Sequence, residues 1–289
     1  SSAVISPAEF HNQPVFLLAK LDVWPRLGIV CGVLIVLLLG AVIFAVSIGT
    51  TSIPHADVAD ALLQYAGIDR GIAESSGTYR VVTLVRLPGV MMAATVGAAL
   101  ACAGAAMQGL FRNPLADPGI VGVSAGASLG VVIAVTQAAA LSDAWRLSNG
   151  PLGDALWRLP VMAFVGALLA ALAVYGLSLQ RGRVNMAGLL LAGVALNSVL
   201  GAITSVLLLR TDDVNKVRTV LSWLVGSLEG RGWDYFHVVK WPILAAALVV
   251  MLYARDLNLL AIGEENAQSL GVNVARVRLI LLVLSCLMT

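Results

Sequence analysis

A serine flanked by glycines is the pattern in this sequence that comes nearest to a catalytic centre. Gly122-Val-Ser-Ala-Gly126 matches the Gly-x-Ser-x-Gly arrangement of serine hydrolases, and intramembrane serine proteases also place a serine beside glycines. A nucleophilic serine needs a base within hydrogen-bonding reach. The three histidines, His11, His55 and His237, lie in the N-terminal segment, in a polar loop and at the edge of an apolar run, so none offers a buried imidazole. We therefore interpret the motif as a site of close helix packing, with an intramembrane serine protease as the alternative.

An acidic segment near the end of the sequence is a second candidate. Gly263-Glu-Glu-Asn-Ala-Gln-Ser-Leu-Gly271 begins with two acids, which favour the first turn of a helix, and ends in a glycine, which favours a helix stop. Asn273 then stands where it can cap the next helix. The pattern predicts a compact helical knob between two apolar runs. A solvated connector is the alternative.

A proline-containing connector is the third candidate. Phe111-Arg-Asn-Pro-Leu-Ala-Asp-Pro118 contains two Xaa-Pro steps, and the residue before a proline is restricted to extended backbone. Neither neighbouring helix can therefore continue through this segment. The sequence predicts a stiff loop of the kind that can serve as a gate, with a simple tight turn as the alternative.

Composition defines the elements that must position these segments. Of 289 residues, 59% are hydrophobic and 12% are charged, whereas a soluble domain is about 45–50% apolar and about 25% charged. The sequence therefore predicts an all-α polytopic membrane protein. A net charge of +2, with no basic cluster longer than Arg181-Gly-Arg183, excludes a nucleic-acid partner. Cys31, Cys102 and Cys286 lie in apolar runs, which indicates packing rather than a disulfide framework or a metal site.

Charge-free stretches locate the spans, because about 20 apolar residues are needed to cross a bilayer. A further run begins at 279 and stops after about 11 residues, so we expect the sequence to be an incomplete copy of a longer protein. A half-helix at 219–228 is expected to pack at one membrane surface, with an ordinary surface helix as the alternative. The predicted spans are 27–54, 87–111, 118–142, 159–180, 184–210 and 235–254, the last with Lys240 reaching towards its start.

The connections alternate between two sides of the membrane. Loops 55–86, 143–158 and 211–234 share one side, and loops 112–117, 181–183 and 255–278 share the other side with the N-terminus. Lysine and arginine are spread almost evenly between the sides, so the positive-inside rule does not choose the orientation.

Small residues recur at every fourth position in two neighbouring spans, a spacing that lets helix backbones approach closely. We expect these two spans to be central, and generic helix packing without a pore is the alternative. The rows are Ala93, Gly97, Ala101, Ala105 and Gly109 in the second span, and Gly122, Gly126 and Gly130 in the third.

The spans carry few polar residues, and no ionisable residue stands in the middle of a span, which argues against a proton- or ion-coupled carrier. No lysine follows a glycine, so the chain has no phosphate-binding loop of the Walker type, and energy for transport must come from another subunit. The polar residues within spans are Gln108, Ser124, Ser128, Asn197, Ser198, Thr204 and Ser205.

Several long strings resemble one family. Arg86-Leu-Pro-Gly89, the run from Gly97 through Met107 to Gly126, and Gly263–Gly271 are similar to the permeases of ATP-binding cassette (ABC) importers for iron-siderophores, haem and vitamin B12. The resemblance covers the chain from about residue 27 to its end. It implies a type II permease bundle of about ten spans, of which this sequence covers roughly seven.

The resemblance also implies partners and a location. It implies a homodimer in the lipid bilayer of the bacterial inner membrane, with two cytoplasmic ATPase subunits and a periplasmic binding protein. The chain itself would be non-catalytic and would bind no cofactor or metal, since ATP and Mg²⁺ belong to the ATPase. Residues 1–26 would form a cytoplasmic segment, 27–289 a permease domain lacking its C-terminal part, and 257–275 cytoplasmic coupling helices within it.

Residue roles follow from the same resemblance. Asn113, Pro114 and Leu115 match a cytoplasmic gate. Exposed basic residues in the outer loops could pair with acids on the binding protein, and these are Arg70, Arg80, Arg218 and Arg231. The match to the ATPase-coupling helix consists of Glu264, Glu265, Ala267, Gln268, Leu270 and Gly271, with Asn266 standing where the family pattern has alanine.

The expected substrate is haem, because the amino-acid sequence of residues 107–119 is more similar to haem-type members of the family than to vitamin B12 members. Ferric siderophore and vitamin B12 remain alternatives. Met91, Met92 and Met107 could offer thioethers to haem iron, but adaptable packing is the favoured interpretation of these residues.

Overall fold

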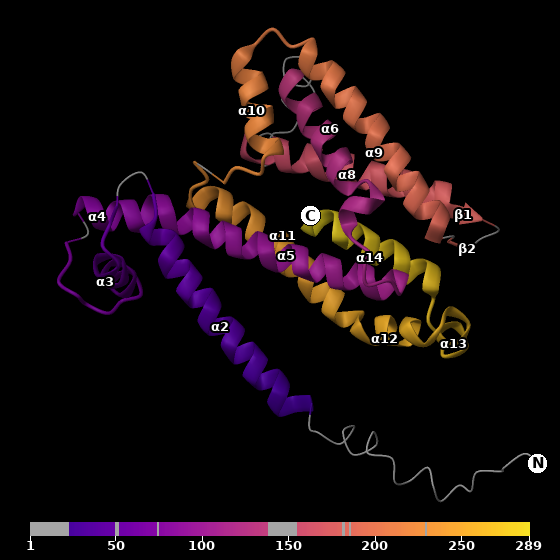
Figure 1. Cartoon of the computed structure of the whole chain (residues 1–289), viewed down its shortest axis with the longest axis horizontal. Helices are drawn as coiled ribbons and strands as arrows, with labels where there is room; N and C mark the ends of the chain where they lie inside the picture. Colours follow the sequence, from indigo (N-terminus) through magenta and orange to yellow (C-terminus); the bar gives the residue numbers. More distant parts are fainter. Residues whose placement is uncertain are drawn as a thin grey trace, which may run out of the picture. The chain divides into compact units, whose positions relative to one another are not determined.

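The computed structural model describes residues 23–49, 52–73, 75–137, 155–180, 183–184, 186–228 and 230–289. The described chain is almost entirely helical (Figure 1). It divides into two compact units, Ser1–Thr83 and Leu84–Thr289, which are described separately. Most of the predicted N-terminal segment, most of the 143–158 loop and two residues of the 181–183 turn lie outside the described residues.

The first unit contains one long apolar helix, α2 (Val23–Ser47), followed by α3 (His55–Tyr65) and α4 (Gly77–Arg80). Pro25–Ser47 is long and apolar enough to cross a membrane, as the 27–54 stretch predicts. The predicted polar loop 55–86 is largely helical. A π-helix, η2 (Val81–Arg86), leads along the chain into the second unit.

Among its described residues, the second unit contains four further helices of membrane-spanning length, and they confirm four predicted spans. Charge-free stretches locate these spans to within a few residues, because charges are costly in hydrocarbon and collect just beyond the helix ends. The helices are α5 (Leu87–Phe111), α8 (Ala155–Ser178), α9 (Met186–Leu209) and α11 (Trp233–Leu252). Between α8 and α9, β1 (Leu179–Gln180) pairs antiparallel with β2 (Arg183–Val184).

The predicted span 118–142 is wrong as a single helix. A 3-10 turn, η3 (Pro118–Val121), comes first, and α6 (Val123–Thr136) has only 14 residues. Gly122 separates the two with a φ of 87°, a left-handed conformation that ends one helical segment before the next begins. Absence of charge in 118–142 does not reveal this break.

Helix caps set two further boundaries. The last helix, α14 (Val274–Met288), begins directly after Asn273, which caps it as predicted by accepting a hydrogen bond from the Arg276 backbone N–H, so the helix starts five residues before the charge-free run at 279. The expected half-helix at 219–228 is α10 (Val214–Leu224), which is capped by Asp213. Caps, rather than hydrophobicity, set where these helices start.

Glycines on α6 allow a close helix contact with α8. A Cβ atom on Gly126 would lie 2.3 Å from the Gly166 carbonyl oxygen of α8, and one on Gly130 would lie 2.1 Å from that of Met162. The α6 row therefore packs as predicted. In the α5 row, Ala93, Gly97, Ala101 and Ala105 are exposed, and Gly109 packs against Leu257 of α12.

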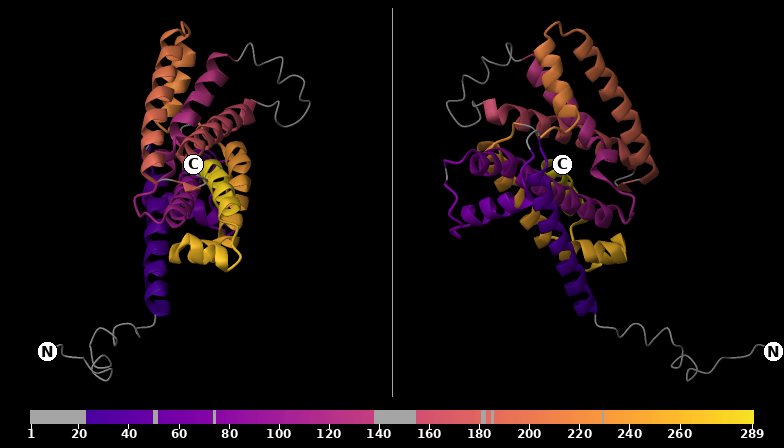
Figure 2. Two further views of the ribbon diagram at one scale, coloured as in Figure 1. Left: turned by 90° about the vertical axis from the view of Figure 1, so that its right-hand side faces the viewer. Right: turned by 60° about the vertical axis from the view of Figure 1, so that its left-hand side comes forward.

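The α5 helix is nevertheless central to the second unit, because it packs against α11, α12 and α14. Its opposite face supplies Met107 and Leu110 to a core that α14 completes with Leu281 and Leu282. Figures 1 and 2 show α5, α11 and α14 side by side, with α12 (Ala254–Ile262) and α13 (Glu264–Ser269) together beyond the end of α11.

Candidate functional site: a helical knob beside a stiff connector

The acidic segment folds as the sequence predicts. Glu264 and Glu265 occupy the first turn of α13, and Gly263 and Gly271 flank the helix with φ values of 136° and 88°. These conformations favour glycine, since a Cβ would be strained there. We call α12 and α13, together with the turn that ends at Gly271, the helical knob (residues 254–271).

One side of α13 is anchored and the other is free for contact. The Ala267 side chain is fully buried, and the Val272 N–H donates to the Ala267 carbonyl at 3.0 Å. Gln268 and Leu270 are exposed, Leu270 with 62% of its surface accessible. This exposed side therefore carries polar side chains and one large apolar side chain.

The Glu264 side chain is already engaged within the chain. It accepts a charge-assisted hydrogen bond from Nη2 of Arg278 on α14. Arg278 was not among the predicted site residues, although an arginine five residues after a helix cap, within an apolar run, is a signal that could have marked it.

The proline-containing connector continues neither neighbouring helix, as the sequence predicts, and side chains hydrogen-bond to its backbone. Arg112 ends α5 in a left-handed conformation at φ 50°, and the Asn113 Oδ1 accepts from the Leu115 N–H at 3.0 Å. Asp117 caps η3 by accepting from the Gly119 N–H at 2.7 Å. Among the predicted gate residues, Pro114 and Leu115 are exposed, and Leu115 has 78% of its surface accessible.

The far end of this connector is fastened to α9. The Asn197 Nδ2 donates to the Gly119 carbonyl at 3.2 Å. A Cβ on Gly193 would lie 2.0 Å from the Ile120 carbonyl oxygen, so α9 and η3 meet backbone to backbone. Asn197 stands out in the sequence as a polar residue within a span, but nothing in its neighbourhood predicts a partner 78 residues away.

The helical knob contacts the span that leads into the connector. A Cβ on Gly109 of α5 would meet the Leu257 Cδ2 of α12 at 3.2 Å. Gly109 lies two residues before the end of α5 and four residues before Asn113. The structure therefore places the predicted coupling helix and the predicted gate on adjoining elements at the same end of α5.

The four predicted docking arginines occupy different settings. Arg70 forms an ion pair with Asp60 at 2.9 Å, and Arg80 is exposed on α4, both in the first unit. In the second unit Arg218 is exposed on α10, and the Arg231 guanidinium lies 4.1 Å from the ring centroid of Tyr235. Arg80 and Arg218 are thus the more available of the four.

The serine motif is used for packing. Gly122 begins α6, Gly126 contacts α8, and the Ser124 carbonyl accepts a hydrogen bond from the Ser128 hydroxyl. Met107 is fully buried in the core, as the packing interpretation expects. Within the described residues, no three histidine, cysteine, aspartate or glutamate side chains gather closely enough to hold a metal ion.

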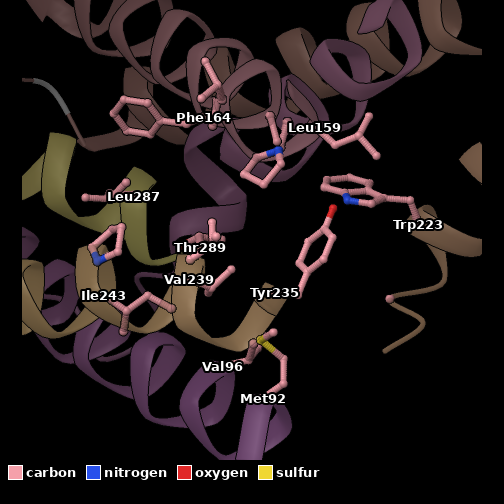
Figure 3. A pocket seen from close by; sticks show the side chains of 18 of the residues that line it. Met92, Val96, Leu159, Phe164, Trp223, Tyr235, Val239, Ile243, Leu287 and Thr289 are labelled. Carbon is pink, nitrogen blue, oxygen red and sulfur yellow. The ribbon is translucent and has the colours of Figure 1, made fainter. Parts of the chain in front are cut away.

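A cavity of about 490 Å³ opens between α5, α8, α11 and α14. Its lining is mainly apolar, and Figure 3 shows the Tyr235 hydroxyl directed towards Trp223 on one side of it. Arg231, one of the four predicted docking arginines, lines this cavity.

The fold defines a multi-pass helical membrane protein with a short helical knob outside its spans. The chain belongs to the FecCD transport family, whose model matches residues 36–289. Curated relatives include the cobalamin import system permease protein BtuC of Halobacterium salinarum, with 38% identity over 78% of this chain and 56% of the relative. The hemin transport system permease protein HmuU of Yersinia pestis is 41% identical over 71% of this chain and 58% of the relative.

A third relative is the ferric enterobactin transport system permease protein FepD of Escherichia coli, with 37% identity over 86% of this chain and 67% of the relative. A solved structure, described as a metal-chelate type ABC transporter in an inward-facing conformation, gives a TM-score of 0.67 at 26% identity, covering 88% of this chain and 71% of that one. The chain thus spans somewhat more than half the length of the first two relatives.

Proposed function

We propose that this chain is the permease subunit of an ABC importer that moves haem from the periplasm to the cytoplasm across a bacterial inner membrane. Import of a ferric siderophore or vitamin B12 by the same architecture is the alternative, and the named relatives include a permease for each of these three substrate classes. Haem is preferred because the amino-acid sequence of residues 107–119 resembles haem-type permeases more than vitamin B12 permeases.

The arrangement that carries the proposal is the helical knob packed against the end of α5. An ATPase docked on Gln268, Leu270 and the acids of α13 could push on a surface that continues through Leu257 to Gly109. Gly109 is near the end of α5, only four residues before the predicted gate of Asn113, Pro114 and Leu115. Work done on the knob could in this way open or close the connector.

The proposed assembly is a homodimer with two cytoplasmic ATPase subunits and a periplasmic binding protein. The chain would be non-catalytic, with ATP and Mg²⁺ held by the ATPase. Among the predicted docking residues, Arg80 and Arg218 are exposed, and their charge could steer an acidic partner in a salt-dependent way.

The test is uptake into proteoliposomes that contain the full-length permease with its ATPase and binding protein. Haemin, cyanocobalamin and ferric enterobactin are offered separately, with ATP and without it. We expect ATP-dependent accumulation of haemin in preference to the other two. Preferential uptake of cyanocobalamin or ferric enterobactin would make that compound the substrate instead of haem. Accumulation of any of the three without the ATPase would contradict the whole proposal.

A further inference from the structure

Arg278 is a buried cation for which the proposed function has so far given no role. Only 8% of the residue is accessible, although it lies in the second turn of the apolar helix α14. Its neighbours Val277, Leu281 and Leu282 belong to the core. A guanidinium in such surroundings is costly unless it is paired, so its partner must be held in place whenever this part of the protein is folded.

The partner is Glu264, at the first position of α13. The Arg278 Nη2 donates to the Glu264 Oε1, while the buried Arg278 Nε has no hydrogen-bond partner among the described residues. Glu264 therefore supplies the bond that offsets the burial of this cation. The pair joins the short helix of the knob to a span through a strong directional contact.

The joints on either side of α13 show why such a contact is needed. Gly263 and Gly271 flank the six-residue helix in conformations that only glycine adopts freely. Glycine joints permit other angles at little cost, so a push on α13 would be absorbed by rotation about them. Ala267 gives α13 a small buried contact, and the ion pair adds a second point of attachment.

We propose that Arg278 is a positioning residue whose ion pair with Glu264 fixes α13 to α14, so that movement of an ATPase bound to the knob is transmitted to the span. This inference rests on the proposed function. It also changes the role of Glu264, which the family resemblance places on the ATPase-binding surface. In this arrangement Glu264 holds the knob together, and contact with the ATPase falls to exposed residues such as Gln268 and Leu270.

The experiment compares Arg278→Gln, Arg278→Lys, Glu264→Gln and the charge swap Glu264→Arg/Arg278→Glu in the full importer. Arg276→Gln is the matched control, because Arg276 is an exposed arginine on the same helix. Three quantities are measured: ATPase retained on the purified permease, ATP hydrolysed, and uptake of whichever probe the wild type imports among haemin, cyanocobalamin and ferric enterobactin. Failure of the wild type to import any of the three counts against the proposed function and not against the ion pair.

We expect Arg278→Gln to retain the ATPase but to lower uptake per ATP hydrolysed about tenfold, within the usual range of coupling between sites. Arg278→Lys keeps the charge and should lose much less, and the charge swap should recover to within about twofold of wild type. Arg276→Gln should behave as wild type. Rescue by the swap distinguishes a specific pair from a general loss of folding.

Two results overturn the inference. One is wild-type uptake per ATP in Arg278→Gln. The other is loss of ATPase binding in Glu264→Gln while Arg278→Gln retains it, because that pattern means Glu264 contacts the ATPase directly. If Arg278→Gln does not accumulate in the membrane, Arg278→Lys and the charge swap decide, and failure of the swap to exceed Glu264→Gln is then the contradicting outcome.

Discussion

Gly271 shows how a single residue can matter through its backbone rather than through its size. A Cβ at this position would meet nothing within 4 Å, yet the φ of 88° is one that β-branched residues avoid. We expect Gly271→Val to cost about 1–3 kcal/mol of strain, relieved by reorientation of α13, and so to reduce uptake per ATP. Gly271→Asn should be mild, because asparagine tolerates this conformation.

Comparing these two variants shows whether residue 271 matters through its backbone conformation or through the absence of a side chain on the surface. Uptake and ATP hydrolysis are measured in the same proteoliposomes for both. Equal losses in Gly271→Asn and Gly271→Val would mean that the ATPase needs a bare surface at this position, and the strain argument would then be wrong.

Among the helices, the two small-residue rows look alike in sequence but differ in the structure. Gly126→Ala would place a methyl group 2.3 Å from a backbone oxygen of α8, which must move away. We expect this change to lower the free energy of unfolding by about 1–3 kcal/mol, as overpacking usually does. Gly97→Ala on α5 has nothing within 4 Å and should change it by less than about 0.5 kcal/mol. Thermal unfolding of the purified permease in detergent measures both.

The same pair of rows shows what the sequence can and cannot predict. Four-residue spacing of small residues identifies helices able to pack closely, but it does not say which face meets a neighbour. Gly126 meets α8, whereas Gly97 is exposed. Most spans and the helix-glycine-cap order around α13 could be predicted because hydrophobic length and capping are local properties. The contacts Asn197–Gly119 and Gly109–Leu257 could not, because they join residues distant along the chain.

In the second unit as a whole, the predicted site residues of the knob and the connector form one connected region. Arg278 and Glu264 join α14 to α13, Leu257 joins α12 to α5, and Asn197 joins the connector to α9. Each joint is a packed or hydrogen-bonded contact, and together they connect the knob to the connector and to α9. This continuity is the structural reason to expect that ATPase movement and gating are coupled here.

The orientation of this region in the membrane gives the last prediction. Leu115 on the connector and Leu270 on the knob lie near the same end of α5. Val225 follows α10 and precedes α11, whereas the knob comes after α11, so a membrane-spanning α11 places Val225 and the knob on opposite sides of the bilayer. Trp233 and Tyr235 lie in the first turn of α11, and the Lys240 Nζ lies 5.3 Å from the Phe236 ring and 4.9 Å from the Trp241 ring. Aromatic and basic residues of this kind are typical of the region where a helix leaves the bilayer. Single cysteines at 115, 270 and 225, in a protein whose Cys31, Cys102 and Cys286 are replaced by alanine, can be labelled with a membrane-impermeant maleimide. We expect Leu115→Cys and Leu270→Cys to react only from the cytoplasmic side and Val225→Cys only from the periplasmic side. Reaction of the first two from opposite sides would separate the knob from the connector and remove the basis of the proposed coupling.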